Sequence, residues 1–212
     1  MPKTQPDEFG KQRKTMTTAL FEVPSWNQIY KMLLSQAEKI RNSGLQPGVV
    51  VGVSRGGWVP ARILSDLLEN PTLVSVRVET FSGATQAKSL PTLTQRVPIP
   101  VTKKEVLIVD DVADSGKSLK VVKEHILQQD AEVAKVATLY YKPWSIVKPE
   151  YFEKETSRWI VFPWDRKEAV RRIVEGSKGT STRKEIRKLT RAGFPKQLAE
   201  KFLREMSVER TC

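Results

Sequence analysis

Two short segments of the chain combine glycines, hydroxyls and charged side chains in patterns that suit phosphate and sugar chemistry. The first, residues 109–118, reads VDDVADSGKS and follows a run of apolar residues. Its small residues can open a helix whose backbone N–H groups, aided by the helix dipole and by the Ser115 and Ser118 hydroxyls, hold an anion. Asp110 and Asp111 would repel a phosphate but can accept hydrogen bonds from a sugar diol. The segment therefore indicates a site for a ribose 5-phosphate.

This segment has two other possible interpretations. Residues 116–118 read Gly-Lys-Ser, as at the end of a Walker A loop, but that motif requires a glycine five positions before Gly116, where the chain has Asp111. The Walker A interpretation is therefore rejected. An Asp-rich turn that merely caps a helix is the structural alternative, and the adjacent aspartates make it the weaker one.

The second segment, residues 52–60, reads GVSRGGWVP and also follows a short apolar run. Glycines let the backbone approach an anion closely and adopt dihedral angles that other residues rarely adopt. Arg55 adds a cation. Taken alone, the glycine pair fits an ordinary turn equally well, and only the first segment makes an anion site the better interpretation.

Alternating apolar runs and helical patterns predict the elements that position both segments. Strands are expected at 49–53, 73–81, 106–109 and 136–141, and helices at 25–44, around 61–68 and at 117–129. Apolar runs that are buried on both faces and separated by helices predict an α/β fold, an open and mainly parallel sheet with helices on both faces. Because such sheets bind ligands beyond the carboxyl ends of their strands, both segments should face one crevice.

Composition divides the chain into three predicted parts. Residues 1–20 are polar without periodicity and predict a mobile N-terminal arm. Residues 21–165 are expected to form the α/β domain, in which the apolar run 159–162 is either an edge strand or a pocket wall. Residues 166–212 are basic and helical, with patterns near 166–175, 182–191 and 196–206, and predict a C-terminal three-helix subdomain.

Charge and cysteine usage limit the class of protein. The net charge is +12, and most of the basic excess lies after residue 165, where solvated lysines on packed helices explain it. The only cysteine, Cys212, excludes an intrachain disulfide, and we see neither a leader pattern nor an apolar run long enough for a membrane span. With 39% hydrophobic residues we expect a folded, cytoplasmic protein. The only histidine, His125, lies in a predicted helix and is expected to be structural.

Residues 106–118 resemble the signature with which type I phosphoribosyltransferases bind phosphoribosyl pyrophosphate (PRPP). The signature has an apolar strand, two acidic residues and a Thr-Gly-Thr type loop; here serines replace the threonines and Lys117 adds a cation. Residues 52–60 resemble the family's pyrophosphate loop, whose frequent cis peptide would fall between Ser54 and Arg55. The polar stretch 82–98, with Lys88 and Arg96, corresponds to the family's flexible flap, with a surface loop of no function as the alternative.

The resemblance implies a set of site residues. Those expected to bind the ribose 5-phosphate of PRPP are Asp110, Asp111, Val112, Ala113, Asp114, Ser115, Gly116, Lys117 and Ser118. Those expected to bind pyrophosphate are Ser54, Arg55, Gly56 and Gly57. Mg²⁺ is the expected cofactor, with Asp110 and Asp111 near the metal. Asp114 matches the carboxylate near N7 of the base and is the expected catalytic residue, which takes or holds the base proton.

Residues 142–144 (KPW) and 159–165 (WIVFPWD) resemble the guanine-xanthine branch of the 6-oxopurine phosphoribosyltransferases. By matching position, Trp159 would stack on the purine, main-chain groups around Ile160 would read its edge, and Lys142 would face position 6. An aromatic residue in a short apolar run more often belongs to the hydrophobic core than to a ligand site. A core position is therefore the alternative for Trp159, and we assign Phe162 to the core.

The basic tail departs from this branch. It resembles the helical C-terminal extension of an archaeal group of adenine phosphoribosyltransferases built on the 6-oxopurine scaffold. On that ground we expect purine salvage with adenine, from adenine and PRPP to AMP and pyrophosphate; the alternative is a 6-oxopurine enzyme that takes guanine, hypoxanthine or xanthine.

The rival from another class is a regulator that senses PRPP and binds nucleic acid through its tail. Residues 183–203 do have the pattern of a helix, a glycine turn and a helix. We favour the enzyme, with PRPP and a purine base as partners, without nucleic acid or membrane, and, from the family, as a homodimer.

Overall fold

The computed structural model describes residues 21–70, 72–80, 91–177 and 180–209. Contacts divide the chain into two compact units, Trp26–Ser157 and a second one that joins Met1–Ser25 to Arg158–Cys212. The predicted arm, residues 1–20, lies outside the described residues, and the predicted domain boundary after residue 165 stays a prediction. None of the described helices combines the length and apolar character needed to span a bilayer.

The first unit is built on a sheet of six strands. They are β2 (Val49–Ser54), β3 (Leu73–Thr80), β4 (Pro91–Gln95), β5 (Glu105–Ala113), β6 (Val133–Tyr141) and β7 (Tyr151–Glu155). Their spatial order is β4-β3-β2-β5-β6-β7, and all neighbours are parallel except the antiparallel pair β3 and β4. Residues 49–51 and 106–109 of the central strands are completely buried, as expected for parallel strands covered on both faces.

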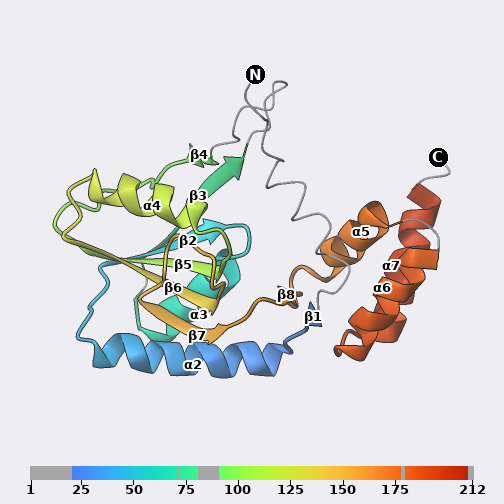
Figure 1. Cartoon of the computed structure of the whole chain (residues 1–212). Helices are drawn as coiled ribbons and strands as arrows, with labels where there is room; N and C mark the ends of the chain where they lie inside the picture. The colour runs from blue at the N-terminus through green and yellow to red at the C-terminus, as the bar shows by residue number, and fades with distance from the viewer. Residues whose placement is uncertain (1–20, 71, 81–90, 178–179, 210–212) are drawn as a thin grey trace, which may run out of the picture. The chain divides into compact units, whose positions relative to one another are not determined.

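Three helices cover this sheet. Helices α2 (Trp26–Asn42) and α3 (Trp58–Leu67) contact each other on one face, and α4 (Lys117–Leu127) lies on the other (Figure 1). The apolar residues that recur at helical spacing along α2 form its buried side: Ile29, Leu33, Ala37 and Ile40. The predicted open, mainly parallel α/β sheet with helices on both faces is confirmed.

Two strands of this sheet were not predicted, and both lie at its edges. β4 and β7 read PTLTQ and YFEKE, and neither has a fully buried residue. Edge strands face solvent with much of their surface, so they lack the apolar run that marks a central strand. β4 falls in the stretch where we predicted a flap at 82–98; Lys88 of that stretch lies outside the described residues, and Arg96 directly follows β4.

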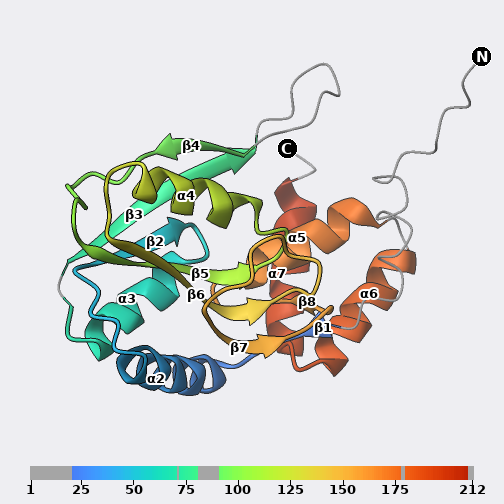
Figure 2. The ribbon, with the colours of Figure 1, turned by 60° about the vertical axis from the view of Figure 1, so that its left-hand side comes forward.

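The second unit has its own small sheet and core. β1 (Phe21–Glu22) pairs in parallel with β8 (Trp159–Ile160), so the apolar run at 159 is a short strand outside the main sheet. The predicted C-terminal helices are confirmed as α5 (Arg166–Gly176), α6 (Thr180–Arg191) and α7 (Lys196–Glu209), which contact one another (Figure 2). One buried cluster joins the helices to the strands: Phe21, Val161, Ala169, Val170, Ile173, Leu189, Phe194, Ala199 and Met206.

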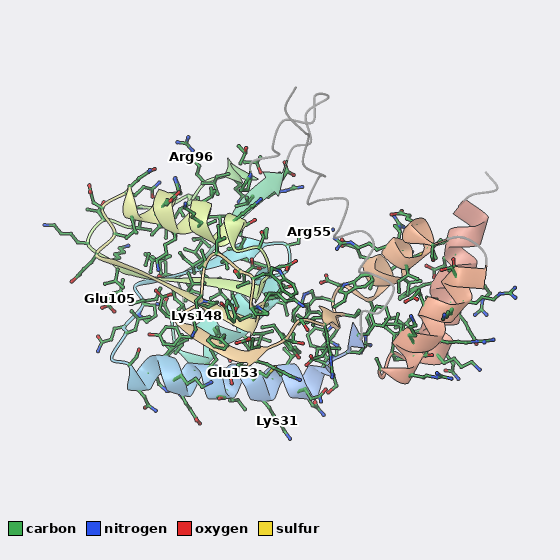
Figure 3. All side chains as sticks on the ribbon, in the orientation of Figure 1. Lys31, Arg55, Arg96, Glu105, Lys148 and Glu153 are labelled. Carbon is green, nitrogen blue, oxygen red and sulfur yellow. The ribbon has the colours of Figure 1, made fainter. Side chains whose placement is uncertain are left out.

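Two carboxylates at β7, Glu150 and Glu153, form hydrogen bonds with neighbouring elements of the first unit. Glu153 of β7 lies near α2 (Figure 3), where it accepts a hydrogen bond from Lys39 at 2.9 Å. Glu150 accepts one from the Val136 backbone N–H at 2.7 Å and one from Lys123 at 2.8 Å. Burial alone would raise the pKa of Glu150, but these hydrogen bonds and the Lys123 charge outweigh it and lower the pKa below its usual value.

We therefore expect Glu150→Gln to destabilise the protein in a pH-dependent way. A carboxyl whose pKa is lowered by folding contributes stability above its unfolded pKa of about 4.3, and this contribution is lost as the pH falls through the folded value. Chemical denaturation should give a loss of about 1 to 2 kcal/mol at neutral pH, because two hydrogen bonds to a charged group are weakened. The difference from the wild type should shrink below pH ~4. A loss that is the same at both pH values, or one matched by the exposed control Glu132→Gln, would contradict this account.

Candidate active site

The strand order brings two loops together at one end of the sheet. From β2 the chain continues to β3 on one side, whereas β5 is the neighbour of β2 on the other side. The loops after β2 and β5 therefore leave the same end in different directions, and open α/β sheets bind ligands in the crevice at such a switch point. Figure 3 shows Arg55, directly after β2, at the opposite end of the sheet from Glu105, the first residue of β5.

The loop after β2 lies directly against the end of β5. Its Ser54-Arg55 peptide bond is cis, as predicted. Gly56 faces the Asp111 carboxylate so closely that a methyl group there would occupy the position of that carboxylate. A Cβ on Gly57 would lie 2.8 Å from the Asp110 Cα, inside van der Waals contact. The structure thus brings the predicted pyrophosphate residues and the two aspartates together, and it shows why these two positions are glycines.

The end of β5 leads into a helix start that suits an anion. Asp110 accepts a hydrogen bond from the Asp111 backbone N–H at 2.9 Å, and Asp111 is only 8% exposed. Gly116, the residue before α4, has a φ of +75°, a conformation that L side chains rarely adopt. The first turn of α4 carries Lys117 and Ser118 and no acidic residue, so its backbone N–H groups and its dipole favour negative charge.

A third loop, after β6, meets the same residues. The Lys142 backbone N–H donates to the Ala113 carbonyl at 3.0 Å, and that of Ile146 donates to the Ser115 carbonyl at 3.1 Å. Lys142 is buried at 6% exposure, an unusual position for a lysine. The structure thus places Lys142 next to the segment 110–118, as the base-binding role requires.

The same loop contains Trp144, for which the sequence predicts no role. The Trp144 indole N–H donates a hydrogen bond to the Asp114 carboxylate at 3.0 Å. The Lys142 ammonium lies 5.5 Å from the centroid of the same indole ring, within the range of a cation–π interaction. The only signal in the sequence was its place in the KPW motif at 142–144.

Two predicted base-binding residues belong to the second unit. Trp159 packs against Phe21, with ring centroids 5.3 Å apart, and is partly buried. Ile160 is buried and pairs with Glu22 in the β1–β8 ladder. Phe162 is buried, as expected of a core residue, and stacks on Trp164 with the ring centroids 4.9 Å apart. The roles given to Trp159 and Ile160 stay predictions.

The remaining polar groups give no dedicated metal cage. In the described part of the chain, no group of three or more His, Cys, Asp or Glu side chains is arranged to hold a metal ion. His125 of α4 lies 3.0 Å from the side-chain amide nitrogen of Gln129, just beyond that helix, and burial, followed by the Arg96 charge, lowers the pKa of His125. A metal at the crevice would therefore need ligands from a substrate in addition to Asp110 and Asp111.

Comparison with known proteins agrees with this architecture. Residues 23–170 match the family model of the phosphoribosyl transferase domain. The chain is 32% identical over 146 residues to the xanthine-guanine phosphoribosyltransferase of Cereibacter sphaeroides, covering 66% of this chain and 84% of that one. It resembles the solved purine phosphoribosyltransferase from Pyrococcus horikoshii, with a TM-score of 0.63 and 36% identity, over 68% of this chain and 93% of that one.

A second solved structure is also similar. A hypothetical protein from Neisseria gonorrhoeae with bound ppGpp matches with a TM-score of 0.61 and 27% identity, over 70% of this chain and 90% of that one. The fold, the two crevice loops and these matches define the class: the chain belongs to the phosphoribosyltransferase family and is an enzyme of the glycosyltransferase type.

The prediction that adenine is the base is wrong. Six curated relatives are all named xanthine-guanine phosphoribosyltransferase, which favours the 6-oxopurine alternative. A similarity to adenine enzymes in particular is not confirmed. The adenine expectation rested on the tail, yet the family match ends at residue 170, before α6 and α7. Base choice depends on the polar groups that meet the base, and the length of a tail carries no information about them.

The close approach of the two loops makes a prediction about the glycines. Gly56→Ala should displace the Asp111 carboxylate, a side chain that can move, and so weaken PRPP binding about tenfold or more with a small change in melting temperature. Gly57→Ala meets backbone atoms instead, including the Val53 carbonyl at 2.7 Å, and should lower the melting temperature strongly. Calorimetry and thermal melts distinguish the two, with Gly176→Ala, which meets nothing within 4 Å, as the matched control. Wild-type PRPP affinity in a folded Gly56→Ala protein would contradict the assignment.

Proposed function

We propose that this chain is a 6-oxopurine phosphoribosyltransferase that joins guanine or xanthine to the ribose 5-phosphate of PRPP and releases pyrophosphate, a reaction of purine salvage. The observation that carries the proposal is the burial of Lys142, whose backbone N–H donates a hydrogen bond to the Ala113 carbonyl at 3.0 Å. An ammonium group only donates hydrogen bonds, so it suits the carbonyl oxygen at position 6 of these bases and leaves the amino group of adenine unpaired. The names of the six curated relatives support the same choice.

The two crevice loops would bind PRPP from both ends. The start of α4, with Ser115, Lys117 and Ser118, suits the 5-phosphate because it presents backbone N–H groups, a hydroxyl-rich loop and a cation. Asp110 and Asp111 suit the ribose hydroxyls. The cis loop around Arg55 and Gly56, pressed against Asp111, suits the pyrophosphate. In this arrangement the bond to be broken, between C1 of the ribose and pyrophosphate, lies between the two loops.

Mg²⁺ fits these residues as an ion that arrives with the substrate. Mg²⁺ keeps several waters and binds through one or two carboxylates together with substrate phosphates, and Asp110 and Asp111 are two adjacent carboxylates that, among the described residues, belong to no metal-binding group of three or more His, Cys, Asp or Glu side chains. When bound, it would neutralise charge on the leaving pyrophosphate. The side chains of this chain then hold the sugar and orient the base.

The chemistry asked of the chain itself is positioning and proton transfer. A purine nitrogen forms a bond to C1 as the bond from C1 to pyrophosphate breaks, and the base gives up one proton. Asp114 is the group that would hold or accept this proton. It is exposed just after β5, and Trp144 contacts both Asp114 and Lys142. The developing sugar cation needs no protein nucleophile. The homodimer and the cytoplasmic location belong to the proposal as expectations from the family.

One test of the proposed function concerns the choice of base. Incubation with PRPP, Mg²⁺ and a panel of purines and pyrimidines, followed by chromatography of the nucleotide products, should show guanine or xanthine preferred over adenine. Lys142→Met, which keeps the length of the side chain but removes its charge, should reduce kcat/KM for these bases by about tenfold to a hundredfold, because a position-6 carbonyl then loses a charged donor. Lys148→Met, an exposed lysine of the same loop, is the control. Adenine as the best substrate would overturn the proposal.

Another test of the proposed function concerns the PRPP site. Asp110→Asn combined with Asp111→Asn should abolish measurable turnover while the melting temperature stays within a few degrees of the wild type, because both carboxylates are assigned to sugar and metal. Release of pyrophosphate is the measurement. Wild-type rates in a folded double variant would remove both residues from the site.

A further inference from the structure

Trp144 stands out as a large aromatic side chain in an exposed position. It is 54% exposed, so burial of its apolar surface does not explain its place in the loop after β6. Its two polar contacts, with Asp114 and with Lys142, are made to the two side chains that we assign to the base. We propose that Trp144 is a positioning residue, which orients the Asp114 carboxylate toward the base; this inference rests on the proposed function.

The hydrogen bond fixes one oxygen of Asp114. A carboxylate at the surface can rotate freely, and proton transfer is efficient only when one oxygen is held within hydrogen-bond reach of the proton. The indole N–H donates to Oδ1 of Asp114 at 3.0 Å and thereby limits this rotation. The second oxygen, Oδ2, stays available to the base. Because Trp has a single donor and no acceptor, it cannot compete with the carboxylate for the proton.

The ring of the same indole positions the other base group. The Lys142 ammonium lies 5.5 Å from the ring centroid, where the negative face of the π system attracts a cation. One rigid ring therefore contacts both the carboxylate and the cation. Both groups are thus positioned relative to one ring, the carboxylate at its N–H edge and the ammonium over its face.

The loop that carries Trp144 is itself fastened to the segment that carries Asp114. On one side of Trp144 the Ile146 backbone N–H donates to the Ser115 carbonyl at 3.1 Å, and on the other the Lys142 backbone N–H donates to the Ala113 carbonyl at 3.0 Å. Gly116 lies against the same loop, since a Cβ there would come within 2.7 Å of the Val147 nitrogen. These contacts on both sides of Trp144 hold the indole in register with Asp114.

The test is a double-mutant cycle at positions 114 and 144. Trp144→Phe keeps an aromatic face for Lys142 but removes the indole N–H, and should lower kcat about tenfold while the KM for PRPP is unchanged. Trp144→Leu removes the aromatic face as well and should also raise the KM for the base. In the Asp114→Asn background, where no carboxylate remains to accept the proton, Trp144→Phe should have no further effect on kcat, measured in single turnovers at high enzyme concentration.

The outcomes separate the proposals. Trp26→Phe, an equally exposed tryptophan on α2, is the control and should leave kcat unchanged. If Trp144 had a purely structural role, its substitution would lower the melting temperature and its effect on kcat would add to that of Asp114→Asn. Such additivity in the cycle, or a wild-type kcat in Trp144→Phe, overturns the positioning role. If the wild type forms no nucleotide from any 6-oxopurine, the proposed function fails and this inference fails with it. An active wild type with an additive cycle overturns the positioning role alone.

Discussion

The close approach of the loop after β2 to the end of β5 is the constraint on which the site depends. β2 and β5 are neighbours in register, with Gly52 beside Val109, so the residues that follow them meet within a few ångströms. Only glycine at positions 56 and 57 leaves room for the Asp111 carboxylate and the β5 backbone. The pairing of two buried strands thus determines where the loop after β2 and the adjacent aspartates of β5 come together, and the third loop reaches the end of β5 because β6 pairs with β5 in parallel.

Much of this core could be predicted from the sequence. Residues 106–109 are an uninterrupted aliphatic run and residues 49–53 are four valines and Gly52, because strands buried on both faces have no polar side to show. The cis peptide at Ser54-Arg55 followed from the resemblance to a family loop and is confirmed. These features are local or repeat a motif, so a single sequence contains them.

What escaped prediction depends on contacts between residues far apart in the chain. Edge strands β4 and β7 are recognisable only by their partners, since Thr92 and Glu153 look like ordinary surface residues. The bond between Trp144 and Asp114 spans 30 residues and forms only because one loop returns to another. The choice of adenine failed because it rested on the helical tail, whereas the six curated relatives, matched outside most of that tail, are named xanthine-guanine phosphoribosyltransferase.

The composition of the second unit has a consequence for the order in which the chain can fold. Residues 26–157 form one continuous stretch, so the sheet and its three helices are complete as soon as that stretch has left the ribosome. The other unit needs Phe21 from near the start of the chain together with Leu189, Phe194 and Met206 from near its end. Phe21 therefore lacks part of its apolar surroundings until the chain has been synthesised as far as Met206. During translation the nascent chain can therefore carry a finished α/β sheet while Phe21 still lacks the apolar side chains that bury it.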